Sequence, residues 1–203
     1  MIYRLTIMSL FFIFCSIISY AQINSNLFGF CTSNSFTYVN TYDTSFLSKV
    51  ESISPKVLRF PGGTIGNFYH PKGEAYGFRV ADVEKYYKGR FSSRVHTLIN
   101  AAKQKEHVKD YIEDFIILAK RYNSKVIVNA NVLSSDKDEI IYILNRFKDK
   151  GIEVIGVELG SELSNRAYKK HIKSVFDYIN IAKLYTLNIK STFPDMKVGV
   201  VAA

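Results

Sequence analysis

Two carboxylates share one face of a short run that is typical of a buried strand. The run from Glu153 to Gly160 (EVIGVELG) is mostly apolar, and side chains alternate between faces along a strand, so Glu158 and Glu162 point the same way. A buried charge costs free energy unless it is paired, hydrogen-bonded or used in chemistry. Just past the strand end, Glu162 could donate a proton to a leaving group, and we take it as the candidate general acid/base. A glutamate that only caps a helix or forms an ion pair is the alternative.

An arginine lies on a second such run. Lys56 to Phe60 (KVLRF) carries Arg59, whose guanidinium fork matches a carboxylate well. Because buried charges need partners, we expect Arg59 and Glu158 to point into the same interior and to contact each other. Gly62 and Gly63 then permit a tight turn at the strand end. We assign Glu158, Gly62 and Gly63 a supporting structural role.

Polar residues near the ends of these runs are candidates for binding the hydroxyl groups of a ligand. They are Arg59, Thr64, Asn67, Tyr69, His70, Asn131 and Ser161. Asn129 shares a face with Asn131, but it lies farther from the strand end, and we expect it only to satisfy buried backbone groups. The segment from Thr64 to His107 is longer than an ordinary connection, and long loops are often functional. Its rings either stack on a ligand or form a small second core; they are Phe68, Tyr69, Tyr76, Phe78, Tyr86, Tyr87 and Phe91.

The elements that position these residues alternate along the chain. Five short apolar runs predict strands at residues 27–32, 56–60, 125–132, 153–160 and 197–203. We expect a short helix over 45–52, and apolar residues at the helical period predict longer ones over 108–122, 140–147 and 172–182. We expect the third helix to have Ser135 as its N-cap and Gly151 as its stop. Strands that alternate with helices indicate an α/β protein with a parallel sheet.

A closed barrel and an open doubly wound sheet are the two parallel architectures to consider. Open nucleotide-binding sheets carry a glycine-rich turn after the first strand, whereas here the first run is followed by Ser33-Asn34-Ser35-Phe36. The polar candidates instead gather at the carboxyl ends of the second, third and fourth runs, where barrel enzymes keep their sites. The sequence therefore predicts an incomplete (β/α)8 TIM barrel of about five strands with their helices, and not a nucleotide-binding protein.

The first 21 residues have the pattern of an export signal. Arg4 precedes an apolar run from Ile7 to Ile18, which is shorter than the roughly 20 residues that span a bilayer. Ser19-Tyr20-Ala21 supplies small residues for cleavage. We expect residues 1–21 to be a signal peptide, residues 22–203 to be the mature chain, and the protein to be secreted or periplasmic, with no membrane contact after cleavage. Cys31 would then be a lone thiol, which we expect to be packed.

The net charge of +9 comes from lysines spread along the predicted helices, without a clustered basic stripe, so the sequence does not favour nucleic acid as a partner. Histidines 70, 96, 107 and 171 lack the spacing of an HExxH metal motif, and there is neither a G-x-S-x-G elbow nor a P-loop. We expect no metal and no cofactor. The oligomeric state is left open.

Two motifs resemble one group of enzymes. The motif VELGSEL (Val157 to Leu163) resembles the strand-four motif of the clan A glycoside hydrolases, above all the heparanase-like and arabinofuranosidase-like families, in which a Glu at that place is the general acid/base. The motif VLRFPGGTIGNFYH (Val57 to His70) resembles their strand-two segment, whose Arg supports the catalytic carboxylates. The two motifs occur in the right order. Where these families have an Asn, which bonds the 2-hydroxyl of the sugar, this chain has Ser161.

The resemblance implies a secreted, retaining O-glycosyl hydrolase that acts on a polysaccharide or oligosaccharide. It implies that residues 22–203 are the N-terminal portion of a catalytic barrel, and that the nucleophile, a Glu on strand seven, lies beyond residue 203. The 203-residue chain alone is then expected to be inactive and prone to aggregate, because its last strand leaves an apolar edge. A carbohydrate-binding barrel protein that has lost the reaction is the alternative, and Ser161 fits it.

Overall fold

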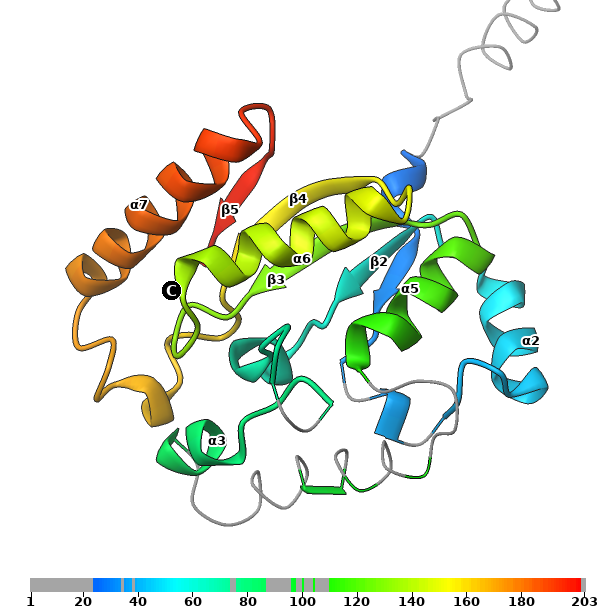
Figure 1. Cartoon of the computed structure of the whole chain (residues 1–203), viewed down its shortest axis with the longest axis horizontal. Coiled ribbons are helices and arrows are strands. Elements are labelled where there is room, and N and C mark those ends of the chain that lie inside the picture. The colour runs from blue at the N-terminus through cyan, green and yellow to red at the C-terminus, as the bar shows by residue number, and fades with distance from the viewer. Residues whose placement is uncertain are drawn as a thin grey trace, which may run out of the picture.

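The computed structural model describes residues 24–33, 35–37, 39–73, 76–86, 96–97, 100, 104 and 110–201 (Figure 1). The expected signal peptide lies outside these residues, as do Tyr87, Phe91 and His107, so the cleavage after Ala21 stays a prediction. Within the described parts of the chain, no helix is both long and apolar enough to cross a membrane.

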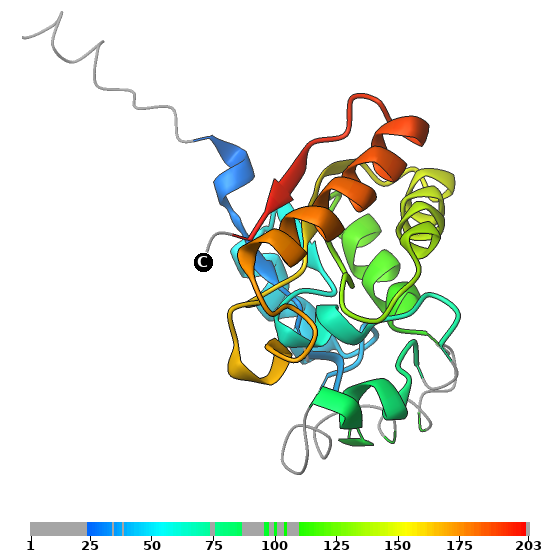
Figure 2. The same cartoon turned by 90° about the vertical axis from the view of Figure 1, so that its left-hand side faces the viewer.

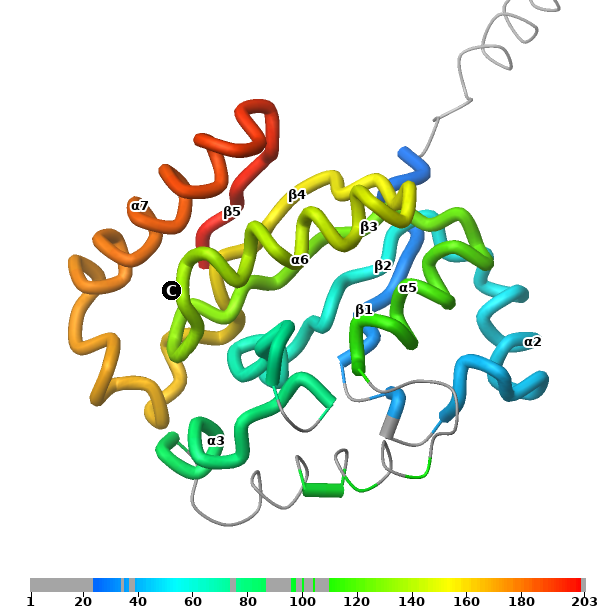
Figure 3. Tube along the Cα trace, viewed as in Figure 1, coloured from blue at the N-terminus to red at the C-terminus, as the bar shows by residue number. Residues whose placement is uncertain are grey.

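Five parallel strands form one sheet. They are β1 (Gly29–Cys31), β2 (Val57–Phe60), β3 (Lys125–Ala130), β4 (Val154–Leu159) and β5 (Val198–Val200). Their order in the sheet is their order in the chain, with β1 and β5 at the two edges (Figure 3). A doubly wound sheet reverses its strand order, and this one does not. The predicted fold class is therefore confirmed: the sheet has the winding of a β/α barrel and is not closed.

Four of the helices form where the sequence predicted them. They are α2 (Thr44–Ile53), α5 (Tyr111–Arg121), α6 (Lys137–Asp149) and α7 (Val175–Thr192). Asp43 caps α2 and Asp110 caps α5, while Ser174 and Asp177 form a capping box on α7. Each cap satisfies backbone N–H groups that have no partner within the helix.

One predicted helix cap is wrong. Asp136, not Ser135, caps α6, because the Asp136 carboxylate accepts a hydrogen bond from the backbone N–H of Asp138. The Ser135 hydroxyl instead donates to the carbonyl of Asn131 at 2.5 Å. Gly151 has φ +69° just after the helix, as expected of a glycine that ends one.

The two faces of the sheet differ in chemistry. On the face that α5 and α6 cover, Phe60 is fully buried, and its ring centroid lies 5.1 Å from that of Tyr69, 4.9 Å from that of Phe115 and 5.3 Å from that of Phe147 (Figures 1 and 2). The opposite face, which is the interior face of a barrel, carries Arg59. This alternation places charge on one side and a dry aromatic core on the other.

The long segment between β2 and β3 extends the main core with its described residues. It contains the 3-10 helix η3 (Thr64–Phe68) and the helix α3 (Val80–Tyr86), and both lie near the carboxyl ends of the strands (Figure 1). Of its rings, Phe68, Tyr69, Tyr76, Phe78 and Tyr86 are buried. For these five rings, the interpretation as an open stacking surface is wrong, and they join the main core rather than forming a separate one.

Candidate active site

Arg59 and Glu158 meet on the interior face of the sheet, as predicted. Arg59 Nη2 lies 2.5 Å from Glu158 Oε2, and Nε donates to the same oxygen at 2.6 Å. The two side chains reach across β3 and keep exposed fractions of 26% and 37%. Burial alone lowers the pKa of Arg59, but the hydrogen bond and the negative charge of Glu158 outweigh it, so the net pKa is raised. The two side chains thus form an ion pair on the interior face of the sheet, below the carboxyl ends of the strands.

Glu162 lies just past the end of β4, in a turn with unusual backbone angles. Gly160 has φ +90° and Glu162 has φ +51°, a left-handed conformation that is uncommon for a residue with a side chain. The Glu162 side chain is exposed, and its Oε2 accepts a hydrogen bond from Thr64 Oγ1 at 3.3 Å. The structure therefore brings two predicted site residues together at the carboxyl end of the strands.

Asn67 does not face a ligand. Its side chain is fully buried, Nδ2 donates to the Ser161 carbonyl at 2.7 Å, and Oδ1 accepts from the Ser161 N–H at 2.9 Å. Nδ2 also donates to the Tyr168 hydroxyl at 3.3 Å. The expected substrate contact is therefore replaced by a contact to the backbone next to Glu162. Ser161 itself is nearly buried, with an exposed fraction of 6%.

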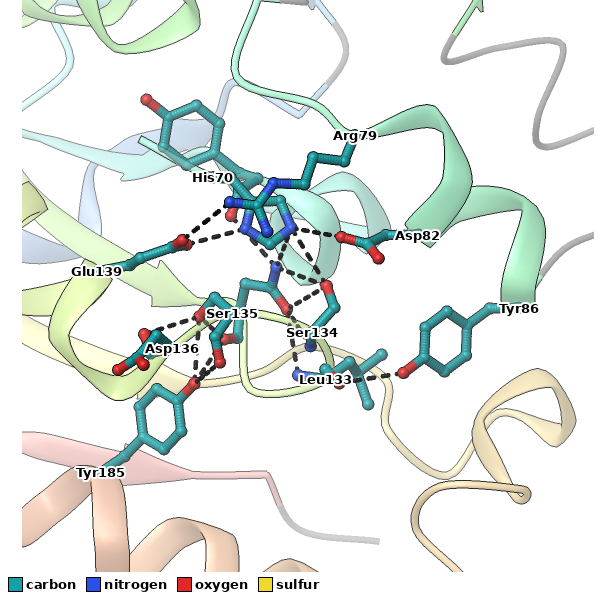
Figure 4. Close-up of polar contacts among 12 residues, drawn as sticks. His70, Arg79, Asp82, Tyr86, Leu133, Ser134, Ser135, Asp136, Glu139 and Tyr185 are labelled. Atoms are coloured by element: carbon teal, nitrogen blue, oxygen red, sulfur yellow. Dashed lines mark hydrogen bonds and ion pairs between the residues drawn. The ribbon is translucent and has the colours of Figure 1, made fainter. Parts of the chain in front are cut away.

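His70 belongs to a buried polar cluster (Figure 4), and Asn131 joins it through its contacts with His70 and Ser134. His70 is fully buried; Nδ1 lies 2.9 Å from Glu139 Oε2, and Nε2 lies 3.0 Å from Asp82 Oδ2. The second approach lacks the direction of a hydrogen bond, and Asp82 Oδ2 is buried without one. Ser134 Oγ and Asn131 Nδ2 lie 3.3 and 3.4 Å from Nε2. Because a carboxylate oxygen accepts, the short contact to Glu139 fits a His70 ring that donates from Nδ1.

The other end of Asn131 is also occupied. Its Oδ1 accepts hydrogen bonds from the backbone N–H groups of Leu133 and Ser134, both at 3.1 Å. Asn131 is 5% exposed and His70 is fully buried, so neither faces the mouth. The prediction that they bind a substrate directly is contradicted, because both side chains are used to join β3, α6 and the segment after η3.

Tyr69 points away from the mouth as well. Its exposed fraction is 2%, and its hydroxyl donates to Asp110 Oδ1 at 2.9 Å. Burial raises the pKa of Tyr69 well above its ordinary value, and the charge of Asp110 adds to this. Burial also raises the pKa of Asp110. Tyr69 therefore supports the core, and the expected substrate contact is contradicted for it too.

The turn after β2 requires its glycines. Gly62 has φ +72° and Gly63 has φ +61°. A Cβ on Gly62 would lie 2.2 Å from Cys31 Sγ, and one on Gly63 would lie 2.7 Å from Ser33 Oγ. Cys31 is exposed rather than packed, which corrects our expectation, because it lies on the uncovered interior face of the edge strand β1. Its Sγ accepts a long contact of 3.9 Å from Arg59 Nη1.

Asn129 differs most from its expected role. It is 1% exposed, and neither atom of its amide group has a hydrogen-bond partner in the described part of the chain. It lies opposite Glu158 in the β3–β4 register, and a Cβ on Gly66 would lie 1.9 Å from Asn129 Oδ1. The expectation that Asn129 satisfies buried backbone groups is therefore wrong.

Neither a protein-family model nor a curated protein matches the chain. A solved structure, that of an α-L-arabinofuranosidase from Thermotoga maritima in complex with arabinose, superposes on 78% of this chain with a TM-score of 0.51 and 20% sequence identity. The fold is that of an incomplete β/α barrel. The chain spans about a third of that enzyme's length, 33%. At this identity the likeness shows the fold, and activity does not transfer with it.

In a β/α barrel the carboxyl ends of the strands form the active-site face. Glu162 and Thr64 lie on that face, and Arg59 and Glu158 lie below it in the interior. A groove of about 710 Å³ lies elsewhere in the described part of the chain: α7 and β5 line it, with Val175, Ile179, Leu187 and Val200 among its residues. It is almost wholly apolar and contains no carboxylate, so we do not assign it to the chemistry.

Positive charge gathers around His171, on the loop from β4 to α7. A pocket of about 480 Å³ there is lined by Leu163, Ser164, Lys169 and Lys173, among others. Burial, together with the charges of Lys85, Lys170 and Lys173, lowers the pKa of His171 in the same loop. The structure thus brings Lys85 of α3 to lysines nearly ninety positions away, a cluster that the sequence analysis did not foresee.

Sequence reasoning also missed the acids that hold the buried cluster. Asp82 and Glu139 lie in the first turns of α3 and α6, and Asp110 caps α5. Acidic residues are common at these helix positions for electrostatic reasons, so their type and place gave no sign of a second role. Among the described residues, no group of three or more His, Cys, Asp or Glu side chains is placed so that it could hold a metal ion.

Proposed function

We propose that this chain is the N-terminal part of a secreted, retaining glycoside hydrolase in which Glu162 is the general acid/base. One observation carries the proposal. Glu162 is an exposed carboxyl at the carboxyl end of β4, held at Oε2 by Thr64, on the face where β/α barrels build their sites. The likeness of the fold to an arabinofuranosidase supports the class of reaction.

In the proposed reaction, Glu162 donates its proton to the glycosidic oxygen as the bond from the anomeric carbon to that oxygen breaks. A second carboxylate, which the family resemblance places beyond residue 203, forms the bond to the anomeric carbon. The ionised Glu162 then removes a proton from water as the water displaces that carboxylate. The Arg59–Glu158 pair keeps the interior charge balanced below this position.

The lysines on the loop that follows Glu162 favour a glycan that carries acidic groups. Lys169, Lys170 and Lys173 lie on this loop, and the charge of Lys85 of α3 acts on His171 of the same loop. Ammonium groups attract carboxylate or sulfate groups, and the attraction falls as salt rises. We therefore propose an acidic polysaccharide or oligosaccharide as the substrate.

A non-catalytic carbohydrate-binding barrel is the second candidate, and Ser161 favours it. The serine that stands where the resembled families have a sugar-binding Asn is nearly buried, so it reaches a ligand less well than an Asn would. Such a protein would bind glycans without cleaving them.

The test compares the complete protein with its Glu162→Ala variant on natural glycosides and on activated aryl glycosides. A sugar alkoxide needs a proton to leave, whereas a nitrophenolate hardly does, so Glu162→Ala should slow the first cleavage about 10²- to 10⁴-fold and the second much less. Glu153→Gln is the matched control, because Glu153 is an exposed glutamate just before the opposite end of β4.

If Glu162→Ala lowers the cleavage rate of both substrate types equally, or of neither, Glu162 is not the general acid. Binding of glycans by a wild-type protein that cleaves none of them would favour the second candidate.

A further inference from the structure

Asn67 makes a contact that resembles one step of a strand ladder. Its amide both donates to the carbonyl of Ser161 and accepts from the N–H of the same residue, at 2.7 and 2.9 Å. The β4 ladder ends just before this point, since the last paired residue is Leu159, with Ala130 on one side and Val200 on the other. In the described part of the chain, the Asn67 side chain therefore takes over the backbone pairing where the sheet stops.

The peptide that Asn67 holds is the one that leads into Glu162. Glu162 has φ +51°, and a left-handed conformation at a residue with a side chain costs about 1–3 kcal/mol unless its surroundings impose it. Asn67 is fully buried and contacts Tyr168 as well, so it is itself well fixed. A rigid group thus pins the residue just before the strained one.

The same short helix also holds the other end of Glu162. Thr64, the first residue of η3, donates to Glu162 Oε2, and Asn67 is the fourth residue of η3. Ile65 and Phe68 bury the helix, and Gly66 packs closely on Asn129 of β3. η3 is therefore fixed to the sheet while it contacts both the backbone before Glu162 and its carboxyl.

We propose that Asn67 is a positioning residue, which aims the Glu162 carboxyl at the leaving oxygen by fixing the Ser161–Glu162 peptide. The effect of Asn67 on the rate rests on the proposed function, whereas the contact between Asn67 and Ser161 does not. A carboxyl that is misplaced by about 1 Å can lose about 10²-fold in rate. Asn67 touches no substrate and would act only through Glu162.

The kinetic test is a double-mutant cycle in the complete protein, with Asn67→Ala, Glu162→Gln and the pair of changes together. Asn67→Ala should slow cleavage of natural linkages about 10- to 100-fold and of activated aryl glycosides much less. In the Glu162→Gln background it should have no further effect, because the group that it positions is no longer an acid. Asn165→Ala is the matched control, since Asn165 lies in the same loop and only caps the 3-10 helix η4 (Arg166–Tyr168).

A second measurement needs no activity. Amide hydrogen exchange at Ser161 should speed up in Asn67→Ala, whereas Val157, whose N–H donates to the Lys197 carbonyl, should keep its protection. If the wild-type protein cleaves no glycoside, the proposed function fails and the exchange result alone decides whether Asn67 holds the peptide.

Unchanged exchange at Ser161 in a folded variant would overturn the positioning role. So would a loss of rate that is equal for both substrate types and persists with Glu162→Gln, because that is the behaviour of a purely structural residue. If Asn67→Ala does not fold, Asn67→Ser is measured in the same cycle and against the same two criteria.

Discussion

The buried His70 cluster should contribute strongly to stability. His70 is fully buried, and its ring approaches Glu139 at 2.9 Å and Asp82 at 3.0 Å. In His70→Leu, Glu139 and Asp82 no longer contact the imidazole ring, but their side chains are 17% and 25% exposed and so remain partly hydrated. Glu139 also keeps Arg79, whose Nη2 lies 3.5 Å from Glu139 Oε1.

The expected cost follows from these contacts. One hydrogen bond to a charged group is worth about 1.5–3 kcal/mol. His70→Leu removes the bond to Glu139, so we expect a loss of about 1.5–3 kcal/mol. His70→Gln should restore part of this, because its amide N–H can still donate to Glu139.

Urea unfolding of the three proteins at neutral pH measures the difference. The matched control is His96→Leu, because His96 is half exposed and lies 3.7 Å from Glu84, so the change should stay within about 0.5 kcal/mol. A loss below about 1 kcal/mol in His70→Leu, or one equal to that of His96→Leu, would refute the role of the cluster in holding the segment after β2 against α6.

Three further outcomes follow from other contacts. A double-mutant cycle of Arg59→Met and Glu158→Gln, measured by urea unfolding, should give a coupling energy of about 1–2 kcal/mol. This is less than for a buried pair because the side chains are 26% and 37% exposed. A coupling energy near zero would contradict the pairing. Gly62→Ala should destabilise the protein more than Gly151→Ala in the same assay. Both glycines have positive φ, but a Cβ at Gly62 would lie 2.2 Å from a sulfur atom, whereas one at Gly151 would meet nothing. Equal losses of stability would count against the clash. Burial raises the pKa of Tyr185 to about 12, so its contribution to stability is complete below pH 10 and is lost as the pH rises from 10 to 12. The urea midpoint should therefore fall less over that range in Tyr185→Phe than in the wild type, and an identical fall would contradict this.

The alternation of side chains along the strands was enough to predict the interior pair. Leu58 and Phe60 are fully buried on one side of β2, and this leaves Arg59 on the other side, as the same alternation leaves Glu158 on β4. Because parallel strands in sequential order bring β2 and β4 to either side of β3, opposite charges on the same face must meet. No knowledge of the loops was required.

The loops are where the sequence was insufficient. Its pattern placed Asn131 at the end of β3, nearer the mouth than Asn129, and this led us to prefer Asn131 as a ligand-binding residue. The structure shows that Asn131 is occupied by His70 and by backbone groups, whereas the amide of Asn129 has no partner in the described part of the chain. The difference depends on how a long segment folds over the strand ends, and contacts between residues about 60 positions apart leave no periodic trace in the sequence.

In its described part, the segment between β2 and β3 supports the site. The five rings described above and His70 are buried, and the predicted site residues that this part brings to Glu162 are Thr64 and Asn67, both from η3. The loop from β4 to α7 has exposed lysines beside a pocket. Under the proposed function, changes in η3 should therefore alter the rate of bond cleavage, whereas changes in the lysines of the β4–α7 loop should alter which glycan is bound.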